Sequence, residues 1–293
     1  MSLDQKHTSA NGIDFAYLAA GPAEGPLALC LHGFPDSAWT WRHLLPRMAG
    51  AGYRAVAPFM RGYAPTGLDP AGRYQGGALI ADAIALHDVL GGGGDAVIIG
   101  HDWGAMAAYG AAAHAPDRWR RVVTSAVPPA GALARGFLNF DQLKRSWYTF
   151  FFQGPLAEAV VGGDDLAFID RLWADWSPGY DASEDLELLK PCLRDPANLA
   201  AAIGYYRAMF NAALHHPDFA AEQAAAGAPT PQPTLYLHGA DDGCVGVGVA
   251  DGSTEFLGPG SRMEVVANAG HFLHVEQPGK VGDLVIDFLA EGT

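Results

Sequence analysis

Asp102 lies at the centre of a strand-turn-helix pattern that limits the folds open to this chain. Four apolar residues, 96–99, precede the pentapeptide Gly100-His101-Asp102-Trp103-Gly104, and an alanine-rich stretch follows at 105–115. This order predicts a buried strand that passes through a tight turn into a helix, with Asp102 at the apex. Glycines on both sides of the apex let strand and helix approach closely, and the turn presents the central side chain at the carboxyl end of a sheet.

An aspartate at the apex suggests a particular chemistry. Serine is the usual nucleophile there, whereas an aspartate is ionised at pH 7 and can attack a carbon atom without the help of a base. In a chain with 37 glycines the pentapeptide alone is a weak signal. The sequence downstream strengthens it, because strand-like residues 234–237 lead to Asp241 and Asp242, and residues 263–266 lead to His271. Nucleophile, acid and histidine thus follow the chain order of one class of α/β enzymes.

His271 is the predicted base of this set, and a carboxylate would hold its tautomer and stabilise its charged form. Asp241 and Asp242 are both candidates for that carboxylate. We favour Asp242, because strand alternation does not aim two adjacent side chains at the same histidine. Taken singly, the two acids could be turn formers and His271 a surface loop residue; taken together, they predict a catalytic set.

A second candidate loop follows the apolar run 27–31 and has the sequence His32-Gly33-Phe34-Pro35. Loops at the carboxyl ends of central strands are where α/β sheets keep their chemistry. The backbone N–H groups of Phe34 and Trp103 are predicted to converge on an oxygen derived from the Asp102 carboxylate, as an oxyanion hole. The alternative is a tight turn without a catalytic task, and a cis bond before Pro35 would fit either interpretation.

Composition excludes several classes of protein. The chain has 293 residues and a formal net charge of -14, which argues against binding to nucleic acid or to acidic lipids. No apolar run is long enough to cross a bilayer, and residues 1–10 do not resemble a signal peptide. Three widely spaced cysteines without a metal-binding pattern indicate free thiols and a reducing cytoplasm. We therefore expect a cytoplasmic protein with neither nucleic-acid nor membrane partners.

The order of elements predicts an α/β fold with one insertion. Strands are expected at 13–17 near the sheet edge and then at 27–31, 54–57, 122–125, 234–237 and 263–266, and helices at 74–90, 105–115 and 275–289. Between 130 and 228 the strand pattern gives way to aromatic-rich, helix-like sequence. We predict a mostly parallel, doubly wound core domain (1–129 and 229–293), a helical cap domain (130–228), and an active site between them.

Several motifs resemble those of epoxide hydrolases of the α/β-hydrolase fold, and the resemblance extends over nearly the whole chain. They are His32-Gly33-Phe34-Pro35, Arg61-Gly62-Tyr63, Gly100-His101-Asp102-Trp103-Gly104-Ala105 and Gly270-His271-Phe272. The core also resembles haloalkane dehalogenases, which share the aspartate, the tryptophan after it and the histidine. Residues 59–66 depart from the family pattern, because they lack the aspartate often found before the arginine and the Gly-x-Ser after the tyrosine. We expect this departure to change the loop rather than the chemistry.

The resemblance implies that Tyr148 and Tyr206, in the predicted cap, hydrogen-bond and protonate the epoxide oxygen. A phenol with a pKa of about 10 stays neutral at pH 7 and can give its proton to the far more basic alkoxide. The alternative is that the two tyrosines only pack. Trp103, Phe34, Tyr205 and Phe151 are expected to contact the substrate.

The function that the resemblance implies is hydrolysis of an apolar epoxide to a vicinal diol, through an ester on Asp102 that water then cleaves. Epoxide and water are the expected partners, no metal or organic cofactor is needed, and the chain is expected to be a monomer or homodimer. A haloalkane or haloacid dehalogenase with the same nucleophile is the main alternative. Trp103 could supply one of the N–H donors that a halide needs, but Phe34 stands where dehalogenases often have asparagine. A non-catalytic ligand-binding relative is the third.

Overall fold

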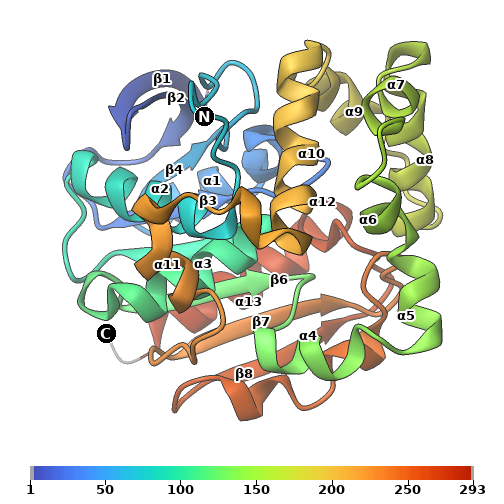
Figure 1. Ribbon diagram of the computed structural model, residues 1–293. Coiled ribbons are helices and arrows are strands. Elements are labelled where there is room, and N and C mark those ends of the chain that lie inside the picture. The colour runs from blue at the N-terminus through green and yellow to red at the C-terminus, as the bar shows by residue number, and fades with distance from the viewer. Residues whose placement is uncertain (1–2, 292–293) are drawn as a thin grey trace.

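A computed structural model describes residues 3–291, and within this range one sheet of eight strands forms the centre of the molecule (Figure 1). The strands are β1 (Asp4–Ala10), β2 (Ile13–Ala20), β3 (Leu27–Leu31), β4 (Arg54–Pro58), β5 (Val97–His101), β6 (Arg121–Ser125), β7 (Thr234–Gly239) and β8 (Arg262–Val266). Their order across the sheet is β1-β2-β4-β3-β5-β6-β7-β8. The mostly parallel, doubly wound sheet that the sequence predicts is therefore confirmed.

The central strands are parallel and fully buried, as their unbroken apolar sequences require. In β5, Ile98 pairs with Leu29 of β3 on one side and with Val122 of β6 on the other. Strands β3, β5, β6, β7 and β8 are parallel, so their carboxyl ends lie along one edge of the sheet. The loops that follow β3, β5, β7 and β8 contain all the core site residues that the sequence predicts.

Thirteen α-helices surround the sheet within residues 3–291. They are α1 (Leu44–Gly50), α2 (Gly76–Val89), α3 (Trp103–His114), α4 (Ala130–Gly136), α5 (Phe140–Arg145), α6 (Trp147–Phe151), α7 (Ala157–Val161), α8 (Ala167–Trp176), α9 (Ser183–Leu189), α10 (Pro196–Phe210), α11 (Ala220–Ala225), α12 (Leu273–Glu276) and α13 (Pro278–Ala290). Helices α2, α3 and α11 pack together on one face of the sheet, and α1 packs with α13, as expected for helices that cover both faces (Figure 1).

Two elements differ from the sequence prediction. Strand β1 is absent from it, because an edge strand whose side chains are mostly exposed lacks an apolar pattern. It pairs antiparallel with β2, and β2 pairs antiparallel with β4, which gives the sheet its only antiparallel part within residues 3–291. The helix predicted over 275–289 is divided at Gln277, because Pro278 has no N–H with which to continue α12.

The inserted segment, residues 130–228, is helical, as its sequence predicts. Helices α5 to α8 lie along one side of the molecule in Figure 1, and α10 lies between them and the sheet. Helix α11 packs on α2 and α3, although it belongs to the same stretch of sequence. The division into core and cap at residues 130 and 228 stays a prediction. In residues 3–291, no helix is long and apolar enough to cross a membrane.

Candidate active site

The turn between β5 and α3 carries Asp102 and is shaped by close backbone contacts. Asp102 has φ 53° and ψ -119°, which is unusual for a residue other than glycine. A Cβ at Gly100 would lie 2.2 Å from the carbonyl oxygen of Gly104, and one at Gly104 would lie 2.1 Å from that of Leu31. Only glycine fits at either position, so these contacts fix the sharp turn that presents Asp102.

His271 lies between the two carboxylates that the sequence assigns to it. Its Nδ1 is 3.0 Å from Oδ2 of Asp242, and its Nε2 is 3.7 Å from Oδ2 of Asp102. Asp242 is buried and its Oδ1 accepts the N–H groups of Cys244 and Val245, at 2.7 and 2.9 Å. Asp241 is exposed to solvent. The structure therefore brings Asp102, His271 and Asp242 together and leaves Asp241 outside.

The charged forms of His271 and Asp242 stabilise each other. Burial lowers the pKa of His271, but the carboxylates of Asp242 and Asp102 outweigh burial and raise that pKa well above its ordinary value. Burial raises the pKa of Asp242, but His271 outweighs burial and holds it below its ordinary value. The surrounding carboxylates thus favour the charged form of His271 in the free protein.

The loop after β3 places Phe34 against Asp102. The backbone N–H of Phe34 donates to Oδ1 of Asp102 at 2.7 Å, and the Phe34–Pro35 peptide bond is cis. A Cβ at Gly33 would lie 2.3 Å from the same oxygen, so the loop can approach only because residue 33 is glycine. His32 anchors the loop: its Nδ1 bonds the Gly33 carbonyl and its Nε2 accepts the N–H of Met60, both at 2.9 Å. Trp103, the other predicted donor, begins α3 directly after Asp102.

Tyr148 and Tyr206 lie together on helices α6 and α10 of the inserted segment, and the Tyr206 ring packs against that of Trp103, the residue after Asp102. Their rings are 5.6 Å apart, and the Tyr206 ring also contacts the Phe34 ring edge-on at 5.2 Å. Burial and the charge of Asp102 raise the pKa of Tyr206 well above its ordinary value. Burial, Cys244 and Asp102 do the same for Tyr148, whose hydroxyl is 3.3 Å from Sγ of Cys244. Both phenols are therefore neutral donors.

Two residues expected to contact substrate have other neighbours. The hydroxyl of Tyr205 donates to the carbonyl of Arg61 at 2.6 Å, so only its ring, 5.5 Å from that of Trp103, faces the site. The ring of Phe151 stacks on Phe168 at 5.9 Å. It is Phe152, one residue further along, whose ring contacts those of Phe34, Tyr148 and Tyr206. A step of one residue turns a helical side chain by about 100°, which explains the difference.

Three side chains at the site have no clear signal in the sequence. The ring of Trp176 lies 5.1 Å from that of His271 and 4.9 Å from that of Tyr148. Its carbonyl accepts the N–H groups of Gly243 and His271, both at 3.0 Å, and so ties the two catalytic loops together. Cys244 lies two residues after Asp242, and Phe152 is one of many aromatic residues in the inserted segment. Composition and spacing do not single these residues out.

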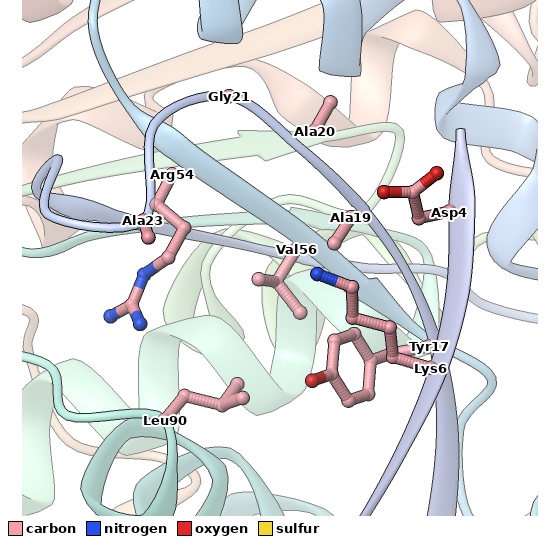
Figure 2. A pocket seen from close by; sticks show the side chains of 10 residues that line it. All are labelled: Asp4, Lys6, Tyr17, Ala19, Ala20, Gly21, Ala23, Arg54, Val56 and Leu90. Carbon is pink, nitrogen blue, oxygen red and sulfur yellow. The ribbon is translucent and has the colours of Figure 1, made fainter. Parts of the chain in front are cut away.

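One hollow borders this set of residues at Trp103, and a larger one lies apart from it. One of about 90 Å³ is lined by Trp103 and Met106 together with residues of α2, α10 and α11. The larger, of about 400 Å³, lies at the sheet edge formed by β1, β2 and β4. Figure 2 shows Lys6 and Arg54 on either side of Val56 in that cleft. None of the predicted site residues lines it, so the chemistry predicted for Asp102 does not take place there.

The order of the strands and the sharp turn between β5 and α3 together define an α/β hydrolase, and in this chain an aspartate occupies the nucleophile position. The chain belongs to this family, because the family described as "Alpha/beta hydrolase family" matches residues 28–284.

Relatives and solved structures with the same architecture cover almost all of the chain. Epoxide hydrolase A of Mycobacterium tuberculosis is 30% identical over 315 residues, and the match covers 97% of each chain. Epoxide hydrolase 4 of Mus musculus is 32% identical over 295 residues, covering 97% of this chain and 78% of the relative. The crystal structure of epoxide hydrolase A from Mycobacterium thermoresistibile has a TM-score of 0.82 at 27% identity and covers 99% of both chains.

Proposed function

We propose that this chain is an epoxide hydrolase, which converts an apolar epoxide to a vicinal diol through a covalent ester on Asp102. The observation that carries the proposal is the pair of buried phenols, Tyr148 and Tyr206, whose rings are 5.6 Å apart and whose pKa values are raised by burial and by the charge of Asp102. An opening epoxide needs a nucleophile on carbon and a proton donor on oxygen, and this site offers both. The names of the relatives at 30% and 32% identity support the same assignment.

Ester formation uses the free oxygen of Asp102. Oδ1 is held by the N–H of Phe34, so Oδ2, the oxygen nearer His271, forms the bond to the epoxide carbon. The carbon–oxygen bond of the ring breaks, and the epoxide oxygen takes a proton from Tyr206 or Tyr148. The imidazolium of His271 supplies the proton that restores the phenol. The products of this half-reaction are a neutral ester, a neutral imidazole and a hydroxyl group.

Ester hydrolysis starts from the change of charge at Asp102. Once the carboxylate is esterified, its negative charge no longer raises the pKa of His271, so the imidazole can act as a base. His271, held by Asp242, takes a proton from water, and the hydroxide adds to the ester carbonyl carbon. The N–H of Phe34 stabilises the resulting oxyanion, and such a donor contributes about 3 kcal/mol. The bond to the diol oxygen then breaks, His271 returns a proton to that oxygen, and the new Asp102 carboxyl group gives its own proton to His271.

The proposal is tested by trapping the ester. In His271→Gln the first half-reaction has its nucleophile but the second lacks its base, so the protein incubated with styrene oxide should gain the mass of one substrate molecule. Peptide mapping should place that mass on Asp102. Asp102→Ala is the matched control and should gain no mass. An unmodified His271→Gln protein, given an epoxide that the wild type turns over, would exclude the covalent route.

A haloalkane would use the same nucleophile but needs N–H donors around the departing halide. Phe34 offers only its backbone N–H, which Asp102 already accepts, and its ring packs on Tyr206 and Phe152. We therefore expect diol from styrene oxide and no halide from 1-bromobutane. Halide release without diol formation would assign the site to dehalogenation instead.

The proposed setting is the cytoplasm, with epoxide and water as the reactants and with neither nucleic-acid nor membrane partners. The free thiols of Cys30, Cys192 and Cys244 and the net charge of -14 support this proposal. The mechanism uses only side chains, backbone N–H groups and water. A monomer or a homodimer is compatible with it, because every residue that it uses comes from one chain.

A further inference from the structure

Three buried polar side chains meet beside His271, whose ring lies 4.8 Å from that of His101. Asp36 follows the loop of Phe34, His101 ends β5, and His274 belongs to α12. Each is at most 4% exposed. One polar atom from each lies within 4.8 Å of the other two, and the rings of His101 and His274 are 4.5 Å apart. The mechanism above uses none of these three residues.

Each of the three side chains keeps one polar atom unused. Within residues 3–291, no hydrogen-bond partner is found for Oδ2 of Asp36, Nδ1 of His101 or Nδ1 of His274, although all three atoms are buried. Leaving a buried polar atom unpaired costs about 1–3 kcal/mol, so three such atoms on one cluster of buried side chains call for a partner that can lie between those side chains.

The hydrogen bonds made by the remaining polar atoms of these side chains show whether the shared partner must donate or accept at each unpaired atom. Nε2 of His101 is 2.9 Å from the carbonyl oxygen of His271; a carbonyl only accepts, so Nε2 carries the proton and Nδ1 is a bare acceptor. Burial lowers the pKa of His101 to about 3, which keeps it neutral. Burial raises the pKa of Asp36 well above its ordinary value, against the opposing effects of hydrogen bonds from the Thr40 hydroxyl and the Ser37 N–H. Oδ1 of Asp36 accepts the N–H of Ser37 at 2.7 Å, so a proton on this carboxyl group would be carried by Oδ2.

His274 is the third side chain of this group. Burial lowers its pKa well below the ordinary value, so it is neutral, and its Nε2 bonds the hydroxyl of Thr40. The shared partner must therefore accept a hydrogen bond from Asp36 and donate one to His101. With His274 it can either donate or accept. A water molecule can do all three at once.

Distances separate water from a metal ion, for which two imidazoles and a carboxylate would also be suitable ligands. A zinc ion about 2.1 Å from each ligand holds tetrahedral neighbours about 3.4 Å apart. A water molecule about 2.8 Å from each partner holds them about 4.6 Å apart. One polar atom from each side chain lies within 4.8 Å of the other two, a limit that admits either occupant, so the contact lengths in a crystal structure distinguish water from metal.

We propose that Asp36, His101 and His274 hold one buried water molecule, and that this group positions His271 for ester hydrolysis. The water fixes the ring of His101, whose Nε2–H holds the carbonyl of His271 and thereby the residue that carries the base. Asp36, His101 and His274 are thus positioning residues rather than catalytic ones. The proposal that this group positions His271 depends on the proposed function. The proposal that the group binds a water molecule does not.

The bound water is tested on the wild-type protein. A crystal structure at about 1.2 Å resolution should show one peak about 2.6–3.2 Å from the three unused atoms. Elemental analysis of the same sample should find no stoichiometric metal. A metal ion about 2.1 Å from the side chains, or three side chains bonded to one another with nothing between them, would overturn the proposal.

The positioning task is tested with two variants of Asp36 in single-turnover experiments. Asp36→Asn keeps a donor and an acceptor and should hydrolyse the ester within about twofold of the wild-type rate, whereas Asp36→Leu loses both and should hydrolyse it at least about tenfold more slowly. In Asp36→Leu, ester formation should be unchanged, so kcat and KM fall together. Equal slowing of both steps, or of neither, would refute the positioning task. A wild type inactive on every epoxide would refute the proposed function and leave the crystallographic test standing.

Discussion

Tyr205 and Tyr206 are neighbours in one helix and have different partners. Tyr205 donates its hydroxyl to the carbonyl of Arg61 at 2.6 Å, whereas no hydrogen-bond partner is found within residues 3–291 for the hydroxyl of Tyr206. Successive helical side chains point about 100° apart, so only one of the two can face Asp102. Spacing does not reveal which one, and only the family resemblance separates them. At the scale of single residues, the sequence shows which side chains could donate a proton more readily than it shows which atoms those side chains contact.

This difference gives a prediction for phenylalanine variants. Tyr206→Phe and Tyr148→Phe should each slow ester formation roughly 10- to 100-fold, and the double variant by about 10⁴, because each phenol can partly replace the other as proton donor. Hydrolysis of the ester, once formed, should keep its rate. Stopped-flow tryptophan fluorescence with excess enzyme resolves the two steps. Tyr205→Phe is the matched control: it should lose stability and keep its rate of ester formation.

Elements differ in how far their own sequence determines them. The turn between β5 and α3 could be predicted because strand, glycines and helix are consecutive in the chain. Strand β1 and the helices of the inserted segment could not be placed, since an exposed edge strand has no apolar pattern and short helices take their orientation from their neighbours. The same limit explains why Phe152, rather than Phe151, packs against Tyr148 and Tyr206.

The close backbone contact at Gly104, in the turn between β5 and α3, gives a prediction about how these elements pack. Gly104→Ala puts a methyl group 2.1 Å from the carbonyl oxygen of Leu31, so β3 and α3 must move apart. We expect a loss of about 3 kcal/mol in the free energy of unfolding, together with loss of ester formation, because Asp102 moves with α3. Gly279→Ala, in the first turn of α13 with no atom within 4 Å of its added Cβ, should be neutral or stabilising. Urea titration and the mass gain with styrene oxide measure the two effects, and an active Gly104→Ala protein would show that the contact is dispensable.

At the scale of the whole molecule, parallel strands bring together residues that are far apart in sequence. Asp102, Asp242 and His271 follow β5, β7 and β8, whose carboxyl ends share one edge of the sheet. The sequence could predict this convergence from the order of elements. It could not predict the polar groups buried behind the site, because Asp36 and His274 show their environment only once loop and helix are packed. Those groups make the stability of the molecule depend on pH.

Acid should destabilise the folded chain well above the range in which ordinary carboxylates titrate. Burial lowers the pKa of His32 to about 4 and of His101 to about 3, and it also lowers those of His238 and His274. Below about pH 6.5 the unfolded chain binds protons at these positions and the folded chain does not, so stability falls as pH falls. Asp36, Asp82 and Glu276, whose pKa values burial raises, have the opposite effect but are fewer.

We therefore expect urea titrations to give a free energy of unfolding lower by about 3 kcal/mol at pH 4.5 than at pH 7. The variant Asp36→Asn tests the opposing carboxyl directly. The folded chain must keep that carboxyl neutral while the unfolded chain ionises it, and an amide has no such cost. The variant should therefore exceed the wild type in stability most at pH 7, and the difference should shrink as pH approaches 4. A free energy of unfolding that stays constant or rises on acidification would contradict this prediction; it would mean that the buried carboxyl groups offset the four histidines, or that these histidines are protonated in the folded chain.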